Sequence, residues 1–194
     1  MSAFLTELDE YLRMSGVEPH FQVPQRRHRK HARAIDYRDR LEPEIWDKTF
    51  KFTVVRNPYA LMVSCWHWWV QKAPHLGNGS FRPLAERVRR LGSFSRFLED
   101  DLGRRYLNNW TGNPEDWFLD EEGRDLVDFI VKQEELDRLP VELVKRVPVP
   151  GGIRIPHFNR TEHDDFRTYY DDRGRRLVEQ RFSYILERFG YRYD

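Results

Sequence analysis

The sequence has little cysteine, no long apolar run and no excess of either charge. Its single cysteine, Cys65, excludes internal disulfides and any cysteine-based zinc site, and the apolar run around it favours a buried, unreactive thiol. No segment approaches the ~18 uninterrupted apolar residues that a membrane-spanning helix needs. The start of the chain carries Glu7, Asp9 and Glu10, which a secretory signal would lack. These absences predict a protein with no membrane partner, located in the cytoplasm.

The charge balance and the composition narrow the possible function classes. Lysine and arginine together number 33 and aspartate and glutamate 32, which gives a formal net charge of +1. This balance argues against a generic polyanion binder, so we expect no nucleic-acid partner. No glycine-rich Walker loop is present, which disfavours a phosphoryl-transferring P-loop enzyme. In contrast, 14% of the residues are aromatic, a composition typical of a folded domain rather than a disordered chain.

The basic residues are nevertheless unevenly distributed. The stretch 25–33 holds four arginines and Lys30 together with His28 and His31, and it contains no acidic residue. A run of this kind is either a solvated surface or an anion site, because a local positive field survives overall neutrality. If the run is an anion site, the acceptor molecule is expected to be anionic.

Periodicity and capping residues predict alternating strands and helices. The expected strands are 50–55 and 126–131, which are rich in β-branched and aromatic residues. The expected helices are 4–12 before Gly16, 59–71 with Pro58 in its first turn, 94–102 capped by Ser93, one from about 134, and a C-terminal apolar stripe over 177–189 that Gly190 ends. Strands separated by helices predict an α/β fold with a parallel sheet flanked by helices. The loop 148–152 is expected inside one domain that spans 1–194.

The junction at Arg56 is the most informative point of the sequence. A strand ending in Arg56-Asn57-Pro58 and continuing into a helix places backbone N–H groups and a positive dipole end at the carboxyl edge of a sheet. Arg56 adds a bidentate donor for phosphate, and Ser64 follows about two turns along the helix. Taken from the residues alone, the junction fits either a phosphate site or an arginine that pairs with a carboxylate.

The segment 50–64, which reads FKFTVVRNPYALMVS, resembles the strand, turn and helix that bind the 3′-phosphate in carbohydrate-type sulfotransferases. These enzymes use 3′-phosphoadenosine 5′-phosphosulfate (PAPS) as sulfuryl donor and need no metal. The family spacing places an arginine at the strand end and a serine eight residues later, as Arg56 and Ser64 stand here. The resemblance extends from about His31 to the end of the chain and includes the segments 31–47, 127–137, 157–161, 169–170 and 189–193.

The resemblance implies a P-loop-nucleotide-hydrolase-like sulfotransferase fold, but one family motif is missing. The family normally begins with a strand and a Pro-Lys-x-Gly-Thr-Ser loop that holds the 5′-phosphosulfate. This sequence has no such motif, and its first lysine is Lys30. We expect Ser2 to be the tail of that loop, with the first strand lost through a truncated start. If the short start is natural, the chain is a degenerate relative that transfers no sulfate.

The resemblance, together with the chemistry of the side chains, indicates candidate residues for donor binding and catalysis. Arg56, Ser64 and Ser2 are expected to bind the donor nucleotide. His31 is the candidate catalytic base, because some uronyl sulfotransferases that this chain resembles carry a catalytic histidine in this segment and a group with a pKa near 6.5 can deprotonate an acceptor hydroxyl. The alternatives are a surface role for His31 and a base, or structural acids, at Glu134 and Asp137.

The acceptor site is expected in the same region of the chain. Arg29 and Lys30 are candidates for contact with an acceptor, and Trp68 is a candidate for stacking against a sugar ring. The neighbouring Trp66 and Trp69 are expected mainly in the core. His157, Asn159 and Thr161 are further polar candidates near the nucleotide, with a helix-capping role as the alternative for Thr161.

The sequence therefore predicts a sulfotransferase that transfers a sulfuryl group from PAPS to a hydroxyl of a carbohydrate or another hydroxylated, anionic metabolite. The alternative is a non-catalytic module that binds nucleotide or sulfated glycan. The alternative to a cytoplasmic location is the Golgi lumen, because a truncated lumenal domain would have the same sequence features.

Overall fold

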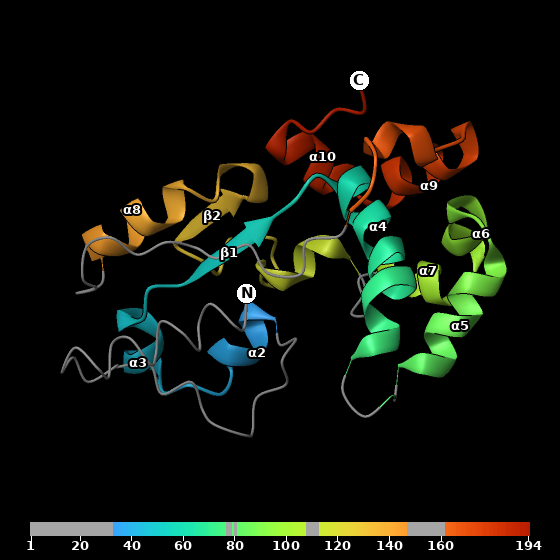
Figure 1. Ribbon diagram of the computed structural model, residues 1–194. Coiled ribbons are helices and arrows are strands. Elements are labelled where there is room, and N and C mark those ends of the chain that lie inside the picture. The colour runs from blue at the N-terminus through green and yellow to red at the C-terminus, as the bar shows by residue number, and fades with distance from the viewer. Residues whose placement is uncertain (1–32, 77–78, 80, 108–112, 147–161) are drawn as a thin grey trace. The chain divides into compact units, whose positions relative to one another are not determined.

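The computed structural model describes residues 33–76, 79, 81–107, 113–146 and 162–194 (Figure 1). The predicted helix over 4–12 and the loop at 148–152 lie outside these residues. The chain divides into two compact units, each built from two separate stretches of sequence. Unit 1 comprises Met1–Val55 and Trp117–Phe158, and unit 2 comprises Arg56–Asp116 and Asn159–Asp194. Each unit is described by itself.

Unit 1 contains a small parallel sheet. Strand β1 (Phe52–Val55) pairs with strand β2 (Phe129–Lys132) in parallel, with Phe52 opposite Phe129 and Val55 opposite Lys132. Both predicted strands and their parallel pairing are therefore confirmed, although each strand begins a few residues later than expected. Among the described residues the fold is α/β with this two-stranded sheet.

Helices and turns complete unit 1. They are α2 (Ala34–Arg38), α3 (Pro43–Lys48), the 3-10 turn η4 (Gln133–Glu135) and α8 (Arg138–Arg146). The helix predicted from about Glu134 thus starts as a 3-10 turn, and its regular part begins at Arg138. Leu139 and Leu143 are four residues apart on α8 and both are buried, as one face of a helix requires.

The described part of unit 2 is helical. Its longer helices are α4 (Pro58–His67), α5 (Arg82–Leu91), α6 (Phe94–Glu99), α7 (Asp101–Leu107), α9 (Asp172–Arg181) and α10 (Ser183–Phe189). Shorter turns are η1 (Trp68–Lys72), η2 (Ala73–His75) and η5 (Phe166–Tyr169), and η3 (Pro114–Trp117) crosses from unit 2 into unit 1. The buried apolar side chains come mainly from α4 to α7, α9 and α10.

The predicted helix over 94–102 is two helices instead of one. Ser93 caps the first as expected, because its hydroxyl accepts a hydrogen bond from the Arg96 backbone N–H at 3.3 Å. Asp100 then takes an extended conformation, and its carboxylate accepts from the Leu102 N–H at 3.0 Å. An aspartate in this position starts a new helix, α7, so the apolar spacing continues through a break in the backbone.

The C-terminal stripe is likewise shared by two helices, α9 and α10, which meet at Phe182. Val178, Phe182 and Ile185 are buried along it, in agreement with the predicted apolar face. Gly190 ends α10 with a left-handed backbone, φ 65°. This confirms its predicted role as the C-terminal cap, because a positive φ favours glycine.

The helix predicted over 59–71 changes form after His67. α4 continues directly into a π-helical turn, η1, and Pro74 lies two residues beyond that turn. Proline has no N–H for the carbonyl of Val70, and its ring crowds that carbonyl. The guanidinium of Arg89 on α5 instead donates to the Val70 carbonyl oxygen, with Nη2 at 2.7 Å and Nε at 3.1 Å. π-helical turns often occur at functional sites.

None of the described helices is both long and apolar enough to cross a bilayer.

Candidate functional site

The turn at Arg56 has the local structure that the sequence predicts. Arg56 directly follows Val55, the last residue of β1, and α4 begins two residues later. Asn57 is the N-cap, since its side-chain oxygen accepts from the Tyr59 backbone N–H at 3.0 Å, and Pro58 occupies the first helical position. Along the chain, Arg56 therefore stands between the end of a strand and a capped helix whose dipole is positive at this end.

Ser64 lies on the flank of α4 rather than at its start. At 1.5 Å per residue it stands about 10 Å along the helix axis from Asn57 and on the same side of the helix. The opposite side carries Tyr59 and Met62, which are 2% and 0% exposed, and faces the core of unit 2. Ser64 is half-buried. A ligand that contacts its hydroxyl therefore lies against the side of α4.

The positive charge of Arg56 acts along this helix. Burial raises the pKa of the Cys65 thiol to about 12, while the charge of Arg56 works in the opposite direction. A thiol with such a high pKa is protonated and unreactive at neutral pH, in agreement with the interpretation of Cys65 as a bystander.

Trp68 follows Ser64 on the same side of the helix, at the first position of η1. Its ring packs edge-on against Trp69, with centroids 5.0 Å apart, and against Phe81 at 5.9 Å. Trp68 remains half-buried, whereas Trp69 is only 3% exposed. Its proposed contact with an acceptor stays a prediction. Trp69 is a core residue, as expected.

Several predicted site residues lie outside the described residues. These are His31, Ser2, Arg29 and Lys30, together with His157, Asn159 and Thr161. The two acidic alternatives, Glu134 and Asp137, are exposed and belong to unit 1. Of the predicted site residues, the structure describes Arg56 before α4, Ser64 on α4 and Trp68 at the start of η1.

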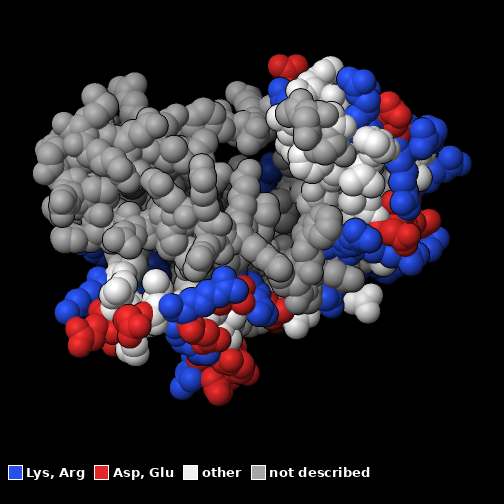
Figure 2. Space-filling model, turned by 90° about the horizontal axis from the view of Figure 1, so that it is seen from below, with Lys and Arg blue, Asp and Glu red and all other residues white. Residues whose placement is uncertain are grey.

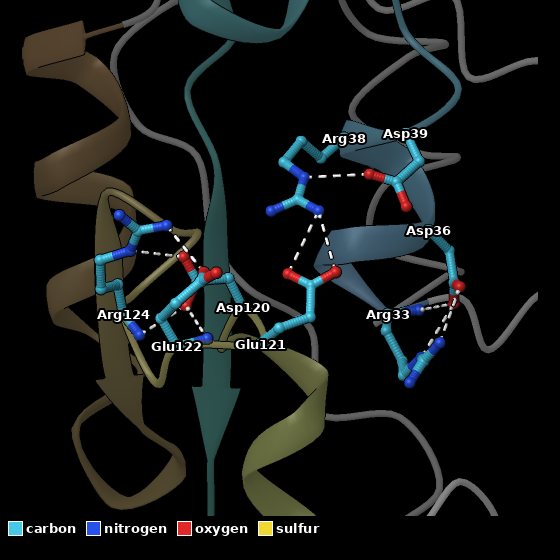
Figure 3. A network of polar contacts seen from close by, with 8 residues as sticks. All are labelled: Arg33, Asp36, Arg38, Asp39, Asp120, Glu121, Glu122 and Arg124. Carbon is cyan, nitrogen blue, oxygen red and sulfur yellow. Dashed lines mark hydrogen bonds and ion pairs between the residues drawn. The ribbon is translucent and has the colours of Figure 1, made fainter.

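The described end of the basic run is committed to ion pairs within unit 1 (Figure 3). Arg33 donates to the carboxylate of Asp36 from both Nε and Nη2, at 3.3 and 3.1 Å, which lowers the pKa of Asp36. Nearby, Arg38 donates to Glu121 through Nη2 at 3.3 Å and to Asp39 through Nε at 3.0 Å. Both arginines pair with carboxylates of their own unit, so Arg33, the described end of the basic run, belongs to a structural network rather than to an anion site.

The same network includes a tight acidic turn. The side chain of Asp120 is 4% exposed and accepts from the backbone N–H of Arg124 at 2.7 Å and from its Nε at 2.7 Å. Burial alone would raise the pKa of Asp120, but these bonds and one from the Glu122 N–H outweigh it and lower the pKa. Asp120 is therefore a charged anchor of the 120–124 turn.

On the described part of the face in Figure 2, lysine and arginine side chains alternate with aspartate and glutamate. Within each described stretch of that face, residues of one sign therefore have neighbours of the other sign. Among the described residues, no group of three or more histidine, cysteine or acidic side chains is placed to hold a metal ion.

The structure also reveals a polar cluster that sequence reasoning missed, at the far end of α4. His67 and Gln71 contact Glu162 and His163, and aromatic rings surround the contact. The available signal was the spacing of His67 and Gln71, which are four residues apart on a predicted helix and therefore on one face. Their partners are more than ninety residues further along the chain and could not be inferred from that spacing.

Comparison with known proteins gave no match, because no family model, no curated protein and no solved structure is similar to this chain. The assignment of a function therefore depends on the motifs of the sequence and on the geometry of α4.

Proposed function

We propose that this chain is a sulfotransferase-like protein that binds the adenosine 3′,5′-bisphosphate part of PAPS. Arg56 and Ser64 hold the 3′-phosphate in this proposal. The observation that carries it is the segment β1–Arg56–α4, in which an arginine follows a strand of a parallel pair and precedes a capped helix. The same order of elements and the same spacing of arginine and serine are what the sequence resemblance implies.

The chemistry of these residues suits a phosphate on the flank of α4. A guanidinium can donate two parallel hydrogen bonds to phosphate oxygens, and a serine hydroxyl can donate a third. The half-buried environment of both residues strengthens such bonds relative to bonds in water.

Sulfuryl transfer would use this bound nucleotide. The acceptor hydroxyl oxygen attacks sulfur, the bond between sulfur and the bridging phosphate oxygen breaks, and adenosine 3′,5′-bisphosphate leaves. A base such as His31 takes the hydroxyl proton, and Trp68, Arg29 and Lys30 are the candidate contacts of a carbohydrate or other hydroxylated acceptor. The alternative within this proposal is a module that binds the nucleotide without transferring sulfate.

Isothermal titration calorimetry with adenosine 3′,5′-bisphosphate tests the binding claim. We expect the full chain to bind and Arg56→Ala to weaken binding by at least about tenfold, because a hydrogen bond to a charged group contributes about 1.5–3 kcal/mol. Arg56→Lys keeps the charge but loses the planar fork, and we expect an intermediate affinity. Arg176→Ala, an exposed arginine on α9, is the matched control and should bind as the wild type does.

Absence of binding by the wild type would remove the proposal, and so would equal affinity of the wild type and Arg56→Ala. Transfer is tested separately, with labelled sulfate from PAPS and a panel of hydroxylated acceptors. Binding with transfer supports the enzyme, and binding without transfer to any acceptor supports the module.

A further inference from the structure

The polar cluster at the C-terminal end of α4 ties two distant stretches of unit 2 together. Gln71 in η1 faces the backbone of Glu162, which precedes η5. The side-chain Nε2 of Gln71 donates to the Glu162 carbonyl oxygen at 2.8 Å, and the Glu162 N–H donates to Gln71 Oε1 at 3.3 Å. Because one group is a donor and the other an acceptor, this reciprocal pair fixes which way the amide of Gln71 points.

The orientation of that amide determines the proton on His67. Nδ1 of His67 lies 3.0 Å from Gln71 Nε2, which is a donor, so Nδ1 must accept. A neutral imidazole that accepts at Nδ1 carries its hydrogen on Nε2. That Nε2 is buried and has no hydrogen-bond partner in the described part of the chain. The contact therefore selects one tautomer of His67 and only its neutral form.

Other titratable groups surround His67. The ring of His163 stacks on it with centroids 5.2 Å apart, and Nδ1 of His163 lies 2.8 Å from the Asp164 carbonyl oxygen. Tyr169 on η5 packs edge-on against His67 at 5.2 Å. Burial, followed by the neighbouring His163, lowers the pKa of His67 below its usual 6.5, while the Asp164 carboxylate opposes the shift. The carboxylate of Glu162 is the remaining charged group on the facing segment.

We propose that His67, Gln71 and the Glu162 backbone form a pH-sensitive latch, which holds segment 162–164 on the end of α4 while His67 is neutral and releases it when His67 gains a proton. A proton on Nδ1 would face the Gln71 NH₂ group, so two donors would meet. Rotating the amide would satisfy His67, but it would place donor against donor and acceptor against acceptor at Glu162. Either arrangement loses hydrogen bonds of the latch.

The direction of the pH dependence follows from linkage. The released state, in which His67 titrates near its usual 6.5, binds more protons than the latched state, in which the pKa is lower. The latch is therefore complete above pH 6.5 and weakens as the pH falls from 6.5 toward the lowered pKa. Within that interval its equilibrium constant falls by up to about tenfold per pH unit.

NMR of the full chain tests the latch directly. Side-chain nitrogen shifts report the tautomer and pKa of His67, and the backbone amide shift of Glu162 reports the latch. We expect the Nε2–H tautomer, a pKa below 6.5, and a Glu162 amide that titrates together with His67. In Gln71→Glu, a nearly isosteric carboxylate can accept from protonated His67 and from the Glu162 N–H, so the pKa of His67 should rise by about 1 or more.

Two further variants distinguish the titration of His67 from that of other histidines. His163→Gln should preserve the titration of the Glu162 amide, and His75→Gln, an exposed histidine on η2, should leave it unchanged. The Nδ1–H tautomer of His67 at neutral pH would overturn the proposal. A Glu162 amide that does not follow the pKa of His67, or whose response disappears in His163→Gln, would overturn it as well.

Discussion

Among the described residues, most of the buried apolar side chains belong to unit 2, whereas unit 1 carries a larger share of the ion pairs. Large side chains such as Met62, Phe97 and Leu98 are at most 1% exposed in unit 2. In unit 1, the ammonium of Lys51 donates to the Trp46 and Thr49 carbonyl oxygens at 3.1 and 2.7 Å and pairs with Asp128 at 3.1 Å.

This difference between the units bears on where an anionic ligand could bind. The described arginines of the unit 1 network, Arg33, Arg38 and Arg124, all have carboxylate partners, so an incoming anion would have to displace an existing pair. In unit 2, α4 combines a packed face with a half-buried face that carries Ser64 and Trp68. A packed helix that presents polar side chains on its other face is the better platform for a ligand.

The largest effect is expected where the core of unit 2 is tightest. A Cβ added at Gly103 on α7 would lie 1.8 Å from the carbonyl oxygen of Phe97 and 3.0 Å from the Cα of Leu98. Because both contacts are with backbone, α6 and α7 would have to move apart. We expect Gly103→Ala to cost more than about 4 kcal/mol of unfolding free energy in urea titrations, at the severe end for point mutants.

Gly92→Ala is the matched control for this prediction. Gly92 has φ 75° and open space around it, so alanine there brings only backbone strain, about 1–2 kcal/mol. Equal costs for the two variants would show that the α6–α7 approach is not tight.

An intermediate loss of unfolding free energy is expected when a buried leucine is changed to alanine in either unit. Leu98 in unit 2 and Leu139 in unit 1 are each 1% exposed. Each change to alanine should cost about 2–5 kcal/mol, with Leu98→Ala toward the upper end, because a larger rigid core collapses less around the cavity. Denaturant unfolding gives both values, and a greater loss from Leu139→Ala would reverse the comparison.

The smallest effect is expected from the charged contacts of unit 1. Asp120→Asn removes the carboxylate that anchors the 120–124 turn and should speed amide exchange in peptides around it, with little change in peptides of α6 and α7. The pKa of Asp120 is lowered from 3.8, so its contribution is present above pH 3.8 and is lost as the pH falls through the lower folded value.

The difference between the wild type and Asp120→Asn should therefore shrink as the pH falls below 3.8. Glu122→Gln, a largely exposed neighbour, is the control and should change exchange less. An effect of Asp120→Asn that is constant with pH would contradict the role of its charge.

Local sequence rules predicted the elements whose signals lie within a few residues. The strand before Arg56, the caps at Ser93 and Gly190 and the start of a helix at Pro58 all depend on neighbouring side chains, and the structure has them. The apolar period could not reveal that Asp100 interrupts a helix, since the spacing of apolar residues passes through the break.

Features that depend on contacts between residues far apart in the chain could not be predicted from the sequence. Arg89 from another helix donates to the Val70 carbonyl oxygen in the π-helical turn η1, and the His67 cluster includes Glu162 from a distant segment. Arg56, Ser64 and Trp68 could be nominated together because one helix carries or adjoins all three. The helices α2 and α3 are short and give too little periodicity for a prediction.

The proposed role of Arg56 is tested most directly by asking whether it binds the 3′-phosphate of the nucleotide. Dissociation constants for adenosine 3′,5′-bisphosphate and for adenosine 5′-monophosphate are measured on the wild type and on Arg56→Ala. We expect the wild type to prefer the bisphosphate by about tenfold or more and Arg56→Ala to lose this preference, because the variant lacks the charged donor for the additional phosphate. A preference of the same size in both proteins would show that Arg56 does not bind the 3′-phosphate.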